Sequence, residues 1–229
     1  MDHVGEAPAS RTTRRYSTPK RDARAAATRA QILEAAQRLF LREGYARSSM
    51  KAIAQEAGVS EKTMYLAFAT KAALLRQVIQ LAVQGDEEGT PLAQRPEWRA
   101  LLAGPVEEVF IRFARLNADQ MTRTAAIIAL GETAASTDDE LGQHRDRAHA
   151  ETRANLRALA AELQRRGALR RGVSKEHAAD VMYAIATDEG IYLRLTGECG
   201  WSPARYADLI ARTLTAALAA TDLGWLDGR

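Results

Sequence analysis

The chain has 229 residues and is 46% hydrophobic, which is enough for one large domain or two smaller ones, each with its own core. It contains no apolar run of 18 residues, no apolar stretch in its polar, Arg-rich start, and only one cysteine, Cys199. We therefore expect a cytoplasmic protein with no membrane span, no intrachain disulfide and no multi-cysteine zinc site.

Charge is distributed unevenly along the chain. Residues 1–76 hold 14 Lys and Arg against 7 Asp and Glu, whereas residues 77–229 hold 18 against 22. A basic first third on an acidic remainder indicates one of two things: a polyanion-binding part on a body that does not bind polyanions, or a basic tail with no partner.

Residues 1–25 are expected to be a disordered basic arm, because Pro8, Pro19 and small, polar and basic residues dominate them. After this arm, apolar side chains recur with helical spacing and predict a first helix that ends before Gly44. The apolar positions of that helix are Ile32, Leu33, Ala36, Leu39 and Phe40.

Three shorter helices are predicted next. Ser49 is placed to cap a helix over residues 50–57, and Gly58-Val59-Ser60 forms a tight turn whose serine caps a helix over residues 61–68. Thr70 then caps a fourth helix, which ends near Gly85. A helix, a short helix, a glycine turn and a helix with polar residues at its start are typical of a helix-turn-helix, whose second short helix fits the DNA major groove.

These residues resemble the DNA-binding domain of TetR-family transcriptional regulators over about residues 26–80. The resemblance rests on the Ile53-Ala54 pair, the Ala57-Gly58-Val59-Ser60 turn, Tyr65 and Phe68 three residues apart, and the Lys71 to Leu75 opening of the fourth helix. It implies an all-α fold in which a three-helix helix-turn-helix domain, residues 26–85, is joined by a linking helix to a larger ligand-binding and dimerisation domain, residues 97–221.

The resemblance also implies which residues contact DNA. Tyr65 and Lys71 would each bind a backbone phosphate, and Lys62 and Thr63 would face the groove. Leu66 and Ala67 are apolar where the family often has polar residues, so one of them contacts a thymine methyl or both contribute little. The predicted DNA-binding residues are Arg24, Ser48, Ser49, Lys51, Lys62, Thr63, Tyr65, Leu66 and Lys71.

The basic side chains of the arm have two interpretations. They lie along phosphates or enter a minor groove, or they form a solvated tail that only increases solubility. These side chains are Arg14, Arg15, Lys20, Arg21 and Arg24.

The rest of the chain is also predicted to be helical, after a polar break between Gly85 and Pro96. The last two helices carry more small and apolar residues than one packing partner requires. They therefore either pair with their symmetry mates in a homodimer or are covered within the monomer. The predicted spans are 104–119, 121–135, 138–166, 174–195 and 203–220.

A pocket for a small-molecule effector is expected in this body, as in the family that the N-terminal part resembles. Each apolar candidate also fits ordinary core packing, which is the default for apolar helix faces. The candidates are Phe110, Phe113, Met121, Ile127, Met182 and Tyr183.

No pattern in the chain suggests catalysis. There is no phosphate-binding glycine loop and no nucleophile elbow, and His144 and His149 are five residues apart, a poor spacing for sharing a metal on a helix. We therefore expect no enzyme, metal or cofactor, but a regulator that binds palindromic double-stranded DNA, most simply a repressor released by a small molecule. An activator, a corepressor-dependent regulator, an architectural DNA-binding protein and an enzyme on a helical scaffold are the alternatives.

Overall fold

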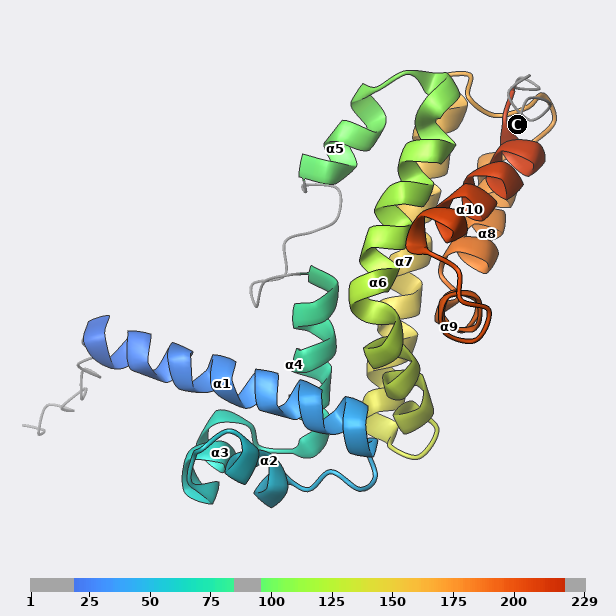
Figure 1. Ribbon diagram of the computed structural model, residues 1–229. Coiled ribbons are helices and arrows are strands. Elements are labelled where there is room, and N and C mark those ends of the chain that lie inside the picture. Colours follow the sequence, from blue (N-terminus) through green and yellow to red (C-terminus); the bar gives the residue numbers. More distant parts are fainter. Residues whose placement is uncertain (1–18, 85–95, 221–229) are drawn as a thin grey trace, which may run out of the picture.

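The computed structural model describes residues 19–84 and 96–220, and helices account for almost all of them (Figure 1). The expected all-α class is confirmed: the described ranges hold no strand, only one isolated bridge between Leu169 and Ala219. The helices are α1 (Pro19–Glu43), α2 (Met50–Glu56), α3 (Glu61–Ala67), α4 (Lys71–Gln84), α5 (Pro96–Ala103), α6 (Val109–Ala135), α7 (Asp139–Arg165), α8 (Lys175–Ala186), α9 (Glu189–Leu193) and α10 (Pro203–Leu218).

Helix α1 begins earlier than the sequence suggested. The expectation of a disordered arm up to residue 25 is wrong for residues 19–25, which form the first turns of α1. Pro19 stands at the first helical position, where a missing N–H costs nothing because that N–H has no partner within a helix. Residues 1–18, with Arg14 and Arg15, lie outside the described residues, whereas Arg21 and Arg24 are exposed on α1.

One apolar core joins the N-terminal helices to the body. The core formed by α1 to α4 includes Ile127 and Ala134 of α6 and Leu141 of α7, all of them buried. In Figure 1 the lower ends of α6 and α7 meet α1 and α4, while α2 and α3 lie on the outer side, away from the body. Burial of these side chains therefore fixes the N-terminal helices against the body.

Two expected helix boundaries in the body are corrected. The spans 104–119 and 121–135 are largely one helix, α6, which starts at Val109 and runs through Gly131 without a break. A Cβ at Gly131 would lie 2.6 Å from Ile79 Cδ1, so this glycine permits the close approach of α4. The span 174–195 is interrupted at Asp188, whose carboxylate accepts a hydrogen bond from the Ile191 amide and starts α9.

The core of the body contains a connected set of polar groups. The Tyr206 hydroxyl donates to Asn117 Oδ1 at 3.2 Å, and Asn117 Nδ2 donates to the carbonyl oxygen of Ala186 at 2.7 Å. The Thr122 and Tyr192 hydroxyls are 2.7 Å apart, and the Tyr192 ring stands edge-on to that of Tyr206. These contacts tie α6, α8, α9 and α10 together without leaving the tyrosine hydroxyls unpaired.

Alkaline pH is expected to reveal the burial of Tyr206. Burial, helped by Asp188 and Tyr192, raises the pKa of Tyr206 from 10.0 to about 12. A raised folded-state pKa gives stability that is present below pH 10 and lost as pH rises through 12, roughly 3 kcal/mol in all. Between these two pH values the wild-type protein should therefore lose more unfolding free energy than Tyr206→Phe, as measured by urea titration at each pH. Equal losses would contradict this assignment.

The turn between α2 and α3 is expected to require glycine. Gly58 has φ +66°, in the left-handed region, where a Cβ costs about 1–2 kcal/mol. We expect Gly58→Ala to lower the unfolding free energy by about that amount. Gly197→Ala is the matched control, because Gly197 is not at positive φ and a Cβ there would meet no atom within 4 Å. Thermal unfolding that shifts equally in both variants would contradict the prediction.

Candidate DNA-binding site

Serine hydroxyls start both short helices of the helix-turn-helix. Ser49 Oγ accepts a hydrogen bond from the Ala52 amide at 3.1 Å, and Ser60 Oγ accepts one from the Thr63 amide at 3.1 Å. The Ser60 and Thr63 hydroxyls are also 2.8 Å apart. These caps satisfy amides that would otherwise be unpaired at each helix start, so both expected caps are confirmed.

One face of α3 is turned outward. Glu61, Lys62, Tyr65 and Leu66 are exposed, and their spacing places them on a single side of the helix. On the opposite side Met64 is fully buried, and Phe68, directly after α3, is buried as well. Of the α3 residues that the sequence analysis assigned to DNA, Lys62, Tyr65 and Leu66 lie on this outward face, whereas Thr63 is half-buried.

Arg29 of α1 fixes the end of α3. Its guanidinium donates to the carbonyl oxygen of Ala67 at 3.1 Å and to Gln77 Oε1 at 3.3 Å, and it lies 4.2 Å from the centre of the Phe68 ring. One side chain therefore fixes the positions of α1, α3 and α4 relative to one another. The sequence analysis did not single out Arg29, because a lone arginine within a basic helix carries no distinguishing signal.

A recess of about 530 Å³ lies between α1 and the turn that precedes α3. It brings together Arg24, at the exposed start of α1, and the polar start of α3. Its lining residues are Arg24, Ala27, Thr28, Gln31, Gly58, Val59, Ser60 and Thr63. The guanidinium of Arg24 and the hydroxyls of Ser60 and Thr63 at one recess make a site suited to an anion such as a phosphate.

The N-terminal helices match the family model for bacterial regulatory proteins of the tetR family over residues 32–78. The chain is 31% identical to the HTH-type transcriptional regulator TtgR of Pseudomonas putida over 160 residues, 69% of this chain and 75% of that protein. The chain belongs to the TetR family.

Solved structures of two other proteins share the fold over most of the chain. NalD of Pseudomonas aeruginosa, described as the secondary repressor of the MexAB-OprM multidrug efflux pump, matches 85% of this chain and 98% of its own at 19% identity and a TM-score of 0.63. A transcriptional regulator from Saccharomonospora viridis in complex with choline matches 86% and 100% at 18% identity and a TM-score of 0.65. The fold of a TetR-family regulator, with an N-terminal helix-turn-helix and a helical C-terminal part, is therefore shown.

Ser48 does not fit the DNA contact expected from the TetR resemblance. The residue is 1% exposed, and its hydroxyl donates to the carbonyl oxygen of Gly44 at 2.8 Å. This hydroxyl pairs a carbonyl at the end of α1 and faces the core instead of solvent. Ser49, in contrast, is exposed.

Lys71 is likewise engaged within the protein. Its ammonium donates to the carbonyl oxygen of Tyr45 at 2.9 Å and lies 4.2 Å from the centre of the Tyr45 ring. Burial lowers the pKa of Lys71, while the nearby Asp138 carboxylate acts in the opposite direction. In this structure Lys71 joins the start of α4 to the loop after α1, a role that the sequence did not indicate.

Tyr45 and Asp138 form the polar contact between the helix-turn-helix and the body. The Tyr45 hydroxyl donates to Asp138 Oδ2 at 3.0 Å, while Asp138 Oδ1 caps α7 by accepting from the Glu140 and Leu141 amides. Burial, together with this hydrogen bond, raises the pKa of Tyr45 above its usual range. Arg76 of α4 adds an ion pair to Glu140 at 3.5 Å.

Of the six expected effector-pocket residues, Ile127 alone lies apart from the core of the body. Four of them are buried in the core of the body, as expected if they serve ordinary core packing instead of lining a pocket: Phe110, Phe113, Met121 and Met182. Ile127 belongs instead to the core shared with α1 to α4. Phe110 also borders a hollow of about 290 Å³ beside Arg166, Gly167 and Ala219.

Tyr183 is half-buried and lies among charged groups. The Arg153 guanidinium is 5.5 Å from the centre of its ring, and the His149 ring meets it edge-on. His149 Nε2 is 3.0 Å from Glu132 Oε1, an interaction between α7 and α6 that the sequence did not indicate. Burial raises the pKa of nearby Glu189.

Within residues 19–84 and 96–220, no group of three His, Cys, Asp or Glu side chains is arranged to hold a metal ion.

No single helix in the described part of the chain is long and apolar enough to cross a membrane. Helices α3 and α4 together are long and apolar enough by length and composition alone, but they are bent by 65° relative to each other.

The Tyr45–Asp138 hydrogen bond is expected to stabilise the junction. Tyr45→Phe removes the donor from a carboxylate acceptor and should lower the unfolding free energy by about 1–2 kcal/mol. Tyr65→Phe is the matched control: it also removes one tyrosine hydroxyl, but from a side chain that is 53% exposed, so stability should change by less than ~0.5 kcal/mol. Equal denaturant midpoints for wild type and Tyr45→Phe would show that the contact contributes nothing.

Proposed function

We propose that this TetR-family protein is a homodimeric transcriptional repressor that leaves its operator when a small molecule binds the helical body. The observation that carries the proposal is the outward face of α3, where Lys62, Tyr65 and Leu66 project from a capped helix whose opposite side is fixed in the core. A rigid exposed helix of this kind fits the major groove of DNA.

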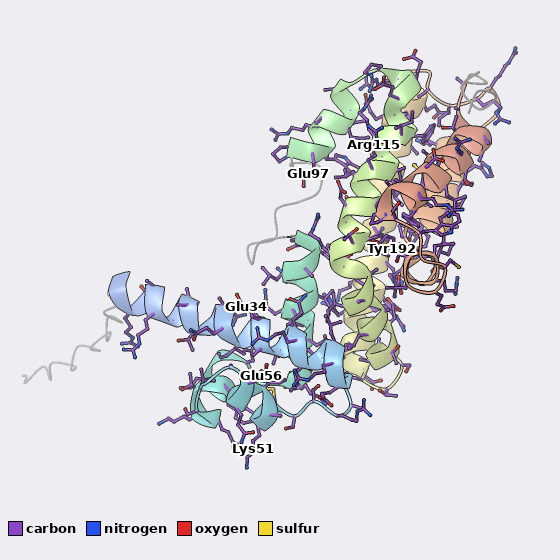
Figure 2. All side chains as sticks on the ribbon, viewed as in Figure 1. Glu34, Lys51, Glu56, Glu97, Arg115 and Tyr192 are labelled. Atoms are coloured by element: carbon purple, nitrogen blue, oxygen red, sulfur yellow. The ribbon has the colours of Figure 1, made fainter. Side chains whose placement is uncertain are left out.

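The proposed DNA contacts follow from exposure. Lys62 and Leu66 face base edges, and Tyr65 gives its hydroxyl to a phosphate. Lys51 lies on the same outer side, pointing away from the body at the lower edge of the molecule (Figure 2), with its ammonium 3.9 Å from Glu61. Ser49, Thr63 and Arg24 complete the set, with Arg24 and the recess beside Ser60 holding a phosphate.

The proposed dimer uses the outer sides of α8 and α10. Most apolar residues of these helices, such as Met182 and Ile210, are covered within the monomer, as the alternative interpretation held. A stripe of apolar and small side chains nevertheless remains half-buried or exposed: Val181, Ile185, Leu209, Thr213, Ala216 and Ala217. Paired with its symmetry mate, this stripe would complete a four-helix bundle and place two α3 helices for a palindromic site.

The effector is proposed to bind the body formed by residues 97–221. Residues 26–85 are proposed to form the DNA-binding unit. Support comes from relatives: NalD is described as a repressor, and the regulator from Saccharomonospora viridis was solved with choline. Since DNA is the proposed partner, the cytoplasm is the expected compartment. A homologue set made of transcriptional regulators supports the expectation that the chain is not an enzyme.

Helix α4 is the proposed connection between effector and DNA. It starts at Lys71, directly after the helix-turn-helix, and packs on α6 where Ile79 meets Gly131. A shift of α6 on effector binding would move α4 and change the distance between the two α3 helices of the dimer. Such coupling is reciprocal, so effector and DNA must weaken each other by the same factor.

The first experiment is a footprint of the purified protein on the DNA upstream of its own gene, against unrelated DNA, at two salt concentrations. Protection of a palindromic site that survives moderate salt, and is lost on adding an effector found by screening, supports the repressor. Binding that strengthens with the effector would instead show a corepressor-dependent regulator, and binding without sequence preference would overturn the proposal.

Arg24 is expected to contribute a phosphate contact. Arg24→Ala should weaken binding to all DNA sequences alike and lower the slope of log K against log salt by about 1 per subunit. Lys175→Ala is the charge-matched control, because Lys175 is exposed at the start of α8, in the body. A slope that is the same for Arg24→Ala, Lys175→Ala and wild type would remove Arg24 from the interface.

A further inference from the structure

Leu66 is the most exposed of the large apolar side chains in the described ranges. It is 80% exposed, compared with 53% for Tyr65, 46% for Leu41 and 36% for Leu209. No other part of the described chain covers it, so it contributes little to the stability of the fold. A single exposed leucine is ordinary on a protein surface, but this one lies on the outward face of α3 and is free to contact a partner there.

The outward face of α3 determines what that partner is. On the same stripe Leu66 is flanked by Lys62 and Tyr65, and Lys51 extends from α2 on the same outer side. These neighbours, and Glu61 on the same face, are polar or charged, so Leu66 is a single apolar point and not part of a broad apolar patch suited to a protein partner. A polar face that carries Lys62 and one apolar point fits the DNA major groove, where thymine alone among the four bases presents a methyl group.

Ala67 does not compete for this role. It is half-buried at the last position of α3, and its carbonyl oxygen accepts the hydrogen bond from Arg29. That contact, with the buried Phe68 ring beneath the same guanidinium, fixes the end of the helix and therefore the direction in which Leu66 projects. A side chain held in this way can select among bases, because its position does not adapt to each base in turn.

We propose that Leu66 is a specificity-determining residue that packs against the C5-methyl group of one thymine in each operator half-site. This inference rests on the proposed DNA-binding function. Leucine has no hydrogen-bonding group, so it selects thymine by burying the methyl group, whereas the edges of the other bases would lose water without gaining a partner.

The experiment replaces thymine by uracil, which differs only by the missing methyl group. The operator is first obtained by selecting binding sites from random duplex DNA with the full-length protein, and each thymine of one half-site is then changed to uracil. One position is expected at which uracil weakens wild-type binding about fourfold, the equivalent of ~0.8 kcal/mol for one buried methyl-sized group. Leu66→Ala should bind thymine and uracil equally at that position.

Leu41→Ala is the matched control, because Leu41 is an exposed leucine on α1, outside the α3 face. It should keep the full uracil effect. Leu66→Asn provides a second measurement: when the selection is repeated with this variant, the preferred base should change at the same position and nowhere else, since asparagine pairs with adenine.

The outcomes separate the inference from the function on which it rests. Failure to select any operator would contradict the proposed function itself. A selected operator at which uracil weakens wild type and Leu66→Ala equally, or at which Leu66→Asn keeps the same base preference, would overturn the role of Leu66 and leave the regulator intact.

Discussion

The position of the helix-turn-helix depends on a core that it does not complete alone. Ile127, Ala134 and Leu141 of the body are buried among side chains of α1 to α4, so excluding water from one cluster also fixes the orientation of α3. Hydrophobic burial is non-directional, and the polar contacts supply direction at its edge. The Tyr45 hydroxyl and the Arg76 guanidinium both bind acceptors at the start of α7.

This arrangement makes α4 the element on which both parts act. Its first residue, Lys71, is held by the Tyr45 carbonyl, and its middle packs on α6 where Gly131 leaves room for Ile79. Packed interfaces of this kind respond to small shifts by changing from one arrangement to another, because their side chains cannot deform continuously. In the proposed mechanism, a change in α6 would reach α3 through contacts that are already formed.

Local signals in the sequence predicted the helix-turn-helix well. The capping serines, Gly58 and the apolar spacing each act within a few residues, so their consequences are readable without a fold. The sequence could not show that Ser48 is buried or that Lys71 binds a carbonyl, because both facts depend on how the end of α1 packs against α4. The same holds for Ile127. Its apolar side chain fitted an effector pocket in the sequence, but the structure buries it in the core formed by α1 to α4. Pro19 was misinterpreted for another reason: a proline that breaks a helix in its middle is well suited to its first position.

The shared core has a consequence for how such regulators are recombined. An N-terminal segment ending at residue 84 would lose the three body residues that close its core, and the carboxylate of Asp138 that caps α7 would lose its tyrosine donor. Exchanging the N-terminal helices between relatives at residue 84 would thus expose apolar surface on both pieces. A chimera that keeps its operator preference and remains folded has to take the lower ends of α6 and α7 along with the helix-turn-helix, or match them to the new partner residue by residue.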